Sequence, residues 1–163
     1  MMRGRRALAL LIAAVVALAT VAAAADLVVV ASPKAPEAIG AYSQAIVAGD
    51  FVFVSGNLPI NPATGKMPED IKEQAKQALD NIKVVLEEAG TGMNKVVKAT
   101  IFLADIADFA AVNEIYSTSF TAPQPARSCV AVADNPRGTT LGIERLARQR
   151  EGNQRTYAPR STT

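Results

Sequence analysis

The chain has 163 residues, half of them apolar and a fifth charged, which is the composition of one globular domain rather than of a disordered chain. It contains no histidine, which excludes Ser-His-Asp and Cys-His nucleophile pairs, imidazole metal ligands and the usual general base near neutral pH. Its one cysteine, Cys129, can form neither an intrachain disulfide nor a cysteine-rich zinc or iron–sulfur site. Any catalysis therefore uses carboxylates, arginine, tyrosine, water and backbone dipoles, and we expect no metal and no cofactor.

The formal net charge of +2 is the sum of three segments of different character. Residues 1–25 carry +3, residues 26–144 carry −5, and residues 145–163 carry +4. The segment that has enough apolar residues to fold is therefore acidic. An acidic domain argues against a nucleic-acid-binding face, so we expect no DNA partner and no RNA partner.

Residues 1–25 have the pattern of a secretory signal peptide. Three arginines in the first six residues precede nineteen uncharged residues, which end in four alanines before Asp26. We therefore expect a cleaved leader, an exported protein and no stable membrane partner after cleavage. The alternatives are an uncleaved signal anchor, since nineteen residues almost reach the length that crosses a bilayer, and an organelle transit peptide, which the absence of serine disfavours.

From Asp26 onward the chain alternates predicted strands and helices. Strands are predicted at residues 27–31, 45–48 and 51–55, and Gly49-Asp50 suits a tight hairpin between the second and the third. Apolar residues over 69–89 recur at the spacing of one buried helix face. Acids at the start of this helix, Glu69 and Asp70, favour its dipole, and Gly90 suits the left-handed position after its end.

A fourth strand is predicted at residues 96–103, and a second helix begins at a capping Asp108 and buries Phe109, Val112, Ile115, Tyr116 and Phe120. The last strands are predicted at 128–133 and 141–146, on either side of a turn at 135–138. The order βββαβαββ predicts an α+β domain over residues 26–147, with a single mixed sheet and two helices packed on one face. We expect further copies of the chain to cover the other face, and the Arg-rich segment 148–163 to be a disordered tail.

Arg127 and Glu144 are the side chains best suited to chemistry. Arg127 opens an apolar strand after a proline-stiffened loop, so its guanidinium can bind a carboxylate through two N–H groups; a surface ion pair is the alternative. Glu144 lies between Ile143 and Leu146 in an apolar strand, where a carboxylate can take part in proton transfer; a plain solvent-facing position is the alternative.

Four more residues are candidates for a binding site, each with a simpler structural reading. Tyr42 can offer a phenol to a ligand or be half-buried, and Asn113 can bind a ligand or face solvent. Gly56 follows a strand and can present backbone amides. Cys129 can line a site, although a buried inert thiol is the simpler interpretation.

Four separated segments together resemble the RidA family, also called YjgF: Ile39–Ala45, Phe51–Gly56, Ala110–Tyr116 and Pro125–Val130. The resemblance extends from about Ser32 to Ala147. It implies a RidA/chorismate-mutase-like fold, a homotrimer with sites between subunits, and cofactor-independent hydrolysis of reactive 2-imino and 2-enamino acids to 2-oxo acids and ammonia. Arg127 would then hold the substrate carboxylate and Glu144 would position the attacking water and relay a proton, while the backbone at Gly56 and Cys129, with Tyr42 and Asn113, would complete the pocket.

The chain departs from the family pattern mainly around its last strand. Gly142 replaces an acid, Asn135 replaces an apolar residue, and Arg145 replaces a small apolar residue and can pair with Glu144 or crowd the subunit interface; Ala41 replaces a proline. The alternatives to a deaminase are a non-catalytic trimer that binds small carboxylates or acts like a chaperone and, with less support, a ribonuclease. Family members are usually cytosolic, mitochondrial or plastidic, which are the compartments expected if residues 1–25 do not direct export.

Overall fold

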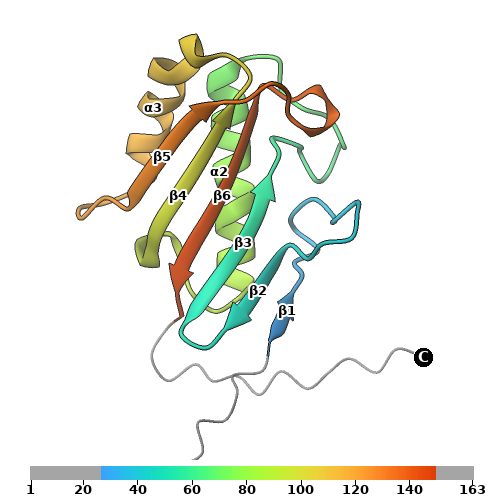
Figure 1. Ribbon diagram of the computed structural model, residues 1–163. Coiled ribbons are helices and arrows are strands. Elements are labelled where there is room, and N and C mark those ends of the chain that lie inside the picture. The colour runs from blue at the N-terminus through green and yellow to red at the C-terminus, as the bar shows by residue number, and fades with distance from the viewer. Residues whose placement is uncertain (1–26, 150–163) are drawn as a thin grey trace, which may run out of the picture.

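The computed structural model describes residues 27–149, which form one six-stranded sheet with two helices behind it in the view of Figure 1. The predicted α+β class is therefore confirmed. The predicted leader and nearly all of the predicted tail lie outside the described residues. Within 27–149, no helix has both the length and the apolar character needed to cross a membrane.

The sheet is mixed, as predicted. Its strands lie in the order β1-β2-β3-β6-β4-β5, and all neighbours are antiparallel except β4 and β5. The parallel pair needs a crossover connection, which the second helix, α3 (Phe109–Thr118), supplies. The strands are β1 (Val28–Val30), β2 (Ala45–Ala48), β3 (Phe51–Asn57), β4 (Val96–Leu103), β5 (Ala126–Ala131) and β6 (Leu141–Arg148).

Three strands extend beyond their predicted boundaries, and one of them is β3, which continues to Asn57 instead of ending at residue 55. The hairpin at Gly49-Asp50 forms as predicted, with Gly49 at a φ of 55°. Strand β6, however, continues two residues past its predicted end because Arg148 pairs with Phe51 of β3. Strand β5 begins two residues early for the same reason, since Ala126 pairs with β4. Arg148 therefore belongs to the sheet and not to the tail.

The helix α2 (Ile71–Glu88) has the buried face that the periodicity predicts, but it begins two residues later and ends one residue earlier than the predicted span 69–89, because Asp70 caps its N-terminus and Ala89 its C-terminus. The Asp70 carboxylate accepts hydrogen bonds from the backbone N–H groups of Lys72 (2.9 Å) and Glu73 (3.0 Å). Gly90 follows the helix at a φ of 78°, the left-handed geometry that glycine adopts at no steric cost. The apolar face of α2 packs on the sheet and forms the core together with the helix-facing side chains of the strands.

The start of α3 differs from the prediction. A 3₁₀ turn, Ile106–Asp108, precedes the helix, and the Asp105 carboxylate accepts the Ala107 N–H at 2.9 Å. Asp108 makes no side-chain capping bond, because the helical backbone has already begun three residues earlier. Phe109 is also not buried as predicted: its side chain is 39% exposed.

The sheet register separates the side chains into two faces. One row across all six strands faces the helices and consists of Val30, Ala45, Val54, Arg145, Ala99 and Arg127. The adjacent row faces the opposite side, which neither helix covers, and consists of Val29, Ile46, Phe53, Leu146 and Lys98. On this open face Val29 is 61% and Phe53 50% exposed, so the face is apolar, as the sequence predicts.

The N-terminal cap of α2 provides a test of the fold. Replacing Asp70 by alanine (Asp70→Ala) removes both hydrogen bonds to the helix N-terminus and should lower the free energy of unfolding by about 1 kcal/mol. The neighbouring Glu69→Ala is the matched control and should change it by less than about 0.5 kcal/mol. Urea unfolding followed by circular dichroism measures both, and equal effects of the two substitutions would contradict the assigned cap.

Candidate functional site

The Arg127 side chain leaves β5 on the helix-covered face and lies against α3. Its Nη1 donates a hydrogen bond to Asn113 Oδ1 at 2.7 Å, and its guanidinium carbon lies 4.7 Å from the ring centroid of Tyr116 and 5.4 Å from that of Phe109. Among residues 27–149, no carboxylate lies within ion-pair distance of this guanidinium. The half-buried arginine is therefore held in place while its other N–H groups are free for an anion.

Cys129 follows Arg127 by two residues on β5 and faces the same side. Its thiol packs against the core beside Ile101 of β4. Burial raises the pKa of the Cys129 thiol, and the positive charge of Arg127 opposes this increase in part. The thiol is therefore protonated near neutral pH, which agrees with an inert wall residue rather than a nucleophile.

Tyr42 and Gly56 line one cavity of about 340 Å³ near the ends of β2 and β3. The Tyr42 hydroxyl accepts a hydrogen bond from the backbone N–H of Ile39 at 3.4 Å, and the side chain is 49% exposed. A Cβ atom added at Gly56 would meet no atom within 4 Å, so the backbone there borders open space. The structure thus brings these two predicted residues together.

Two further residues at this cavity were not predicted. Gln44 is buried, and its side-chain amide holds the loop from Ser32 to Pro36 in place. It accepts the Ser32 N–H (2.6 Å) and donates to the carbonyls of Ser32 (3.2 Å) and Pro36 (2.8 Å). The only sequence indication is an amide side chain directly before an apolar strand. Arg137 lies in the predicted turn at a φ of 64°, and no local pattern shows that this turn borders the cavity.

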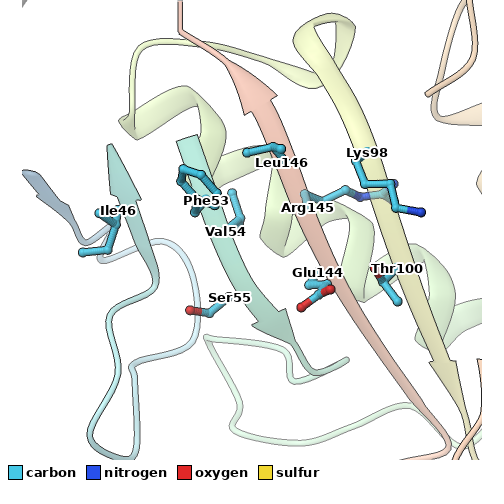
Figure 2. Close-up of a pocket in the computed structure, with 9 residues that line it drawn as sticks. All are labelled: Ile46, Phe53, Val54, Ser55, Lys98, Thr100, Glu144, Arg145 and Leu146. Carbon is cyan, nitrogen blue, oxygen red and sulfur yellow. The ribbon is translucent and has the colours of Figure 1, made fainter. Parts of the chain in front are cut away.

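Glu144 lies on the open face of the sheet, away from Arg127, and the hollow that it borders shares Ser55 with the cavity of Tyr42 and Gly56. It borders a second hollow, of about 270 Å³, with Ser55 on β3 and Thr100 on β4 on either side of it (Figure 2). The nearby Lys98 donates its Nζ hydrogen bond to Ser128 at 2.7 Å. Because Arg127 faces the helices, the two residues predicted to act together lie on opposite faces of one protomer's sheet.

The two substitutions beside Glu144 have distinct structures. Gly142 points to the same face of β6, and a Cβ added there would lie 3.5 Å from Asn135 Oδ1 and 3.9 Å from the Phe102 ring. The Asn135 amide therefore borders the position where the family pattern has an acid. Arg145 does not pair with Glu144, as one reading of the sequence suggests, because it points to the other face and is 3% exposed.

One chain therefore holds the predicted site residues in two places. Arg127 lies with Asn113 and Cys129 on the helix-covered face, whereas the hollow of Glu144 shares Ser55 with the cavity of Tyr42 and Gly56. In the described part of the chain, no group of three or more acidic or cysteine side chains is placed to hold a metal ion. The chemistry that this arrangement offers is capture of an anion by Arg127 and proton exchange at Glu144.

The fold and these side chains define a small α+β protein that has, on an edge strand, an arginine without an acidic partner among residues 27–149, and a sheet face that neither helix covers. The sequence model of the family described as Endoribonuclease L-PSP matches residues 32–149. The chain therefore belongs to this family, the RidA (YjgF) family, as the four sequence segments predict.

The relatives agree with this assignment over nearly their whole length. A RutC family protein of Pyrococcus abyssi is 48% identical over 73% of this chain and 94% of its own. The 2-iminobutanoate/2-iminopropanoate deaminase of Escherichia coli is 44% identical over 74% of this chain and 97% of its own.

Solved structures share the fold. RidA from a Psychrobacter species superposes with a TM-score of 0.73 at 40% identity, covering 74% of this chain and 98% of that one. Escherichia coli TdcF with bound serine gives a TM-score of 0.73 at 38% identity, covering 76% and 99%. The six-stranded sheet with two helices is therefore the fold of this family.

The contact between Asn113 and Arg127 yields a test of anion binding. Asn113→Asp puts a carboxylate against the guanidinium, so it should compete with any bound carboxylate and weaken binding of 2-oxobutanoate at least about tenfold. Isothermal titration calorimetry measures the affinity. Asn94→Asp, which adds the same charge at an exposed position, is the control, and equal affinities in the two variants would contradict anion binding at Arg127.

Proposed function

We propose that this protein hydrolyses reactive 2-imino and 2-enamino acids to 2-oxo acids and ammonia. The observation that carries the proposal is the Arg127 guanidinium, held by Asn113 and by aromatic rings of α3 and paired with no acid of the described chain. Such a group suits a small substrate with a carboxylate. The proposal is supported by 44% identity to a protein named 2-iminobutanoate/2-iminopropanoate deaminase.

The proposed reaction needs little from the enzyme beyond orientation. A protonated imine is already electrophilic, so water adds to its carbon once both are held in line, and the substrate carboxylate is fixed by two N–H groups of Arg127. Glu144 accepts a proton from the attacking water and passes it to the nitrogen. The carbon–nitrogen bond of the tetrahedral adduct then breaks while the adduct's hydroxyl gives its proton to the Glu144 carboxylate, so that ammonia and the 2-oxo acid are released.

We propose further that the working site forms between copies of the chain in a homotrimer. Arg127 and Glu144 lie on opposite faces of one sheet, so Arg127 of one copy would act with Glu144 of another. The exposed apolar row that contains Val29 and Phe53 supports such an assembly, because monomeric proteins rarely expose large apolar surfaces. Tyr42 and Gly56 would supply a wall of the shared pocket, and Cys129 an uncharged surface beside Arg127.

An imine-hydrolysis assay tests the activity directly. The purified protein should clear 2-iminobutanoate or 2-iminopropanoate faster than buffer, and Arg127→Ala and Glu144→Gln should each lower kcat/KM on the order of a hundredfold. Glu73→Gln, an exposed glutamate on α2, is the matched control and should leave the rate unchanged.

Three results, from this assay, from calorimetry and from an RNA-cleavage assay, would each overturn the proposal in a different way. Wild-type protein no faster than buffer would exclude the deaminase. Calorimetric binding of 2-oxobutanoate without turnover would favour a non-catalytic carboxylate binder. If the protein cleaves RNA and the Arg127→Ala variant cleaves it equally well, the nuclease named in the family's description is favoured. Deletion of residues 148–163 would then test whether the basic tail is needed for RNA cleavage.

The shared site can be tested separately by mixing two inactive variants. If the arginine and the glutamate come from different copies, mixed trimers of Arg127→Ala and Glu144→Gln contain some intact sites, roughly one quarter after random exchange. We expect activity to return to about that fraction of the wild-type value after the two proteins are unfolded and refolded together. Activity that stays at the level of the separate variants would mean that both residues act within one copy.

A further inference from the structure

Arg145 is a buried charge that the proposed reaction does not use. It lies in the helix-facing row of the sheet, and its side chain is 3% exposed. Its Nη1 donates to the hydroxyl of Tyr116 at 3.1 Å, while its Nε and Nη2 are buried and have no hydrogen-bond partner among residues 27–149. Burial of an arginine with unpaired N–H groups lowers the stability of the fold unless a hydrogen-bond acceptor or an opposite charge compensates it.

The same tyrosine ring connects Arg145 to Arg127. The guanidinium carbon of Arg145 lies 4.8 Å from the Tyr116 ring centroid, and that of Arg127 lies 4.7 Å from it. In the sheet, Ala99 of β4 pairs with Arg145 on one side and with Arg127 on the other. The small side chain of Ala99 leaves room for both guanidinium groups beneath α3.

No negative charge offsets this pair within the described chain. Neither arginine forms an ion pair there, and the only groups that stabilise Arg145 are aromatic: Tyr116, and Phe120 at 4.9 Å. Burial lowers the pKa of Arg145, contact with Tyr116 raises it, and the charge of Arg127 lowers it. The two cations therefore affect each other, and an anion bound at Arg127 would be attracted by both.

We propose that Arg145 is a second cation of the Arg127 site and strengthens the binding of carboxylate ligands there without touching them. It is a positioning residue, because it contacts Tyr116, which also contacts Arg127, and because its positive charge attracts a ligand bound at Arg127. The inference rests on the proposed function for the identity of the ligand, an acid with a free carboxylate. Because the charge acts through a partly dry interior, its contribution is larger than that of an exposed arginine at the same distance.

A purely structural role for Arg145 predicts a different pattern. Loss of packing would disturb the site for every ligand alike, whereas loss of a charge weakens only ligands that carry one. The test therefore compares 2-oxobutanoate with its neutral amide, 2-oxobutanamide, by calorimetry on the full chain. The variants are Arg145→Met, which keeps the apolar length, and Arg145→Lys, which keeps the charge.

Arg145→Met should weaken binding of 2-oxobutanoate about tenfold and leave binding of 2-oxobutanamide unchanged. Arg145→Lys should restore most of the affinity for the carboxylate. Lys83→Met, which removes one positive charge from an exposed position on α2, should affect neither ligand. If Arg145→Met does not fold, Arg145→Ala replaces it.

Equal weakening of both ligands, or no weakening of either, would overturn the inference. Kinetics on the same proteins keep it distinct from the proposed function: the expected change is a KM about tenfold higher with kcat nearly constant. Wild-type hydrolysis with no effect of Arg145→Met would reject the second cation and leave the deaminase standing. Charge-selective weakening in a protein that hydrolyses no imine would reject the deaminase and leave the second cation standing.

Discussion

The alternation of side chains along β6 is the constraint on which the site depends. This strand lies between β3 and β4, so both of its faces are fixed by pairing on both edges. Arg145 therefore points under α3, while Glu144, one residue earlier, points to the open face, and a shift of one residue would exchange them. No rotamer change can bring Glu144 to Arg127 within one copy, because the sheet itself lies between them. Any reaction that uses both residues therefore requires a second copy at the open face or at the β5 edge.

The second determinant is the aromatic surface of α3. Phe109 and Tyr116 of α3, and Phe120 just after its end, present rings to two guanidinium groups, and these rings replace the carboxylates that usually accompany buried arginines. Aromatic contacts hold a cation without neutralising it. An arginine paired with aspartate would be equally well ordered but would have little attraction left for a ligand. The incomplete burial of Phe109, unexpected from its helical position, follows from this role as a surface beneath Arg127.

Much of the fold could be predicted because its determinants are local. The apolar spacing of α2, the Gly49-Asp50 hairpin and the order of elements depend on neighbours within a few residues, and all of them form as expected. The sequence does not show that Asp105 caps a 3₁₀ turn ahead of α3, because such a turn leaves no separate pattern. Nor does it show that Arg148 belongs to the sheet, because the pairing with Phe51 joins segments almost a hundred residues apart. The candidate site is harder to predict from sequence. Residue types indicate Arg127 and Asn113, which do form a hydrogen bond. The side of the sheet on which Arg127 and Glu144 lie, however, depends on the strand order and on which face the helices cover.

Two residues of β6 determine the charge on either side of the strand. Gly142 carries no side chain and lies beside the Asn135 amide on the open face, while Arg145 places a cation on the helix-covered face. A cation beneath α3 favours retention of an anion at Arg127. Glu144 then remains as the only acid of β6, so proton exchange on this strand has no second carboxylate to share it. A stronger hold on the substrate carboxylate raises the rate only if the transition state carries the same charge, and in imine hydrolysis it does, because the carboxylate is a spectator throughout. Under the proposed function, tighter carboxylate binding should therefore lower KM more than it changes kcat.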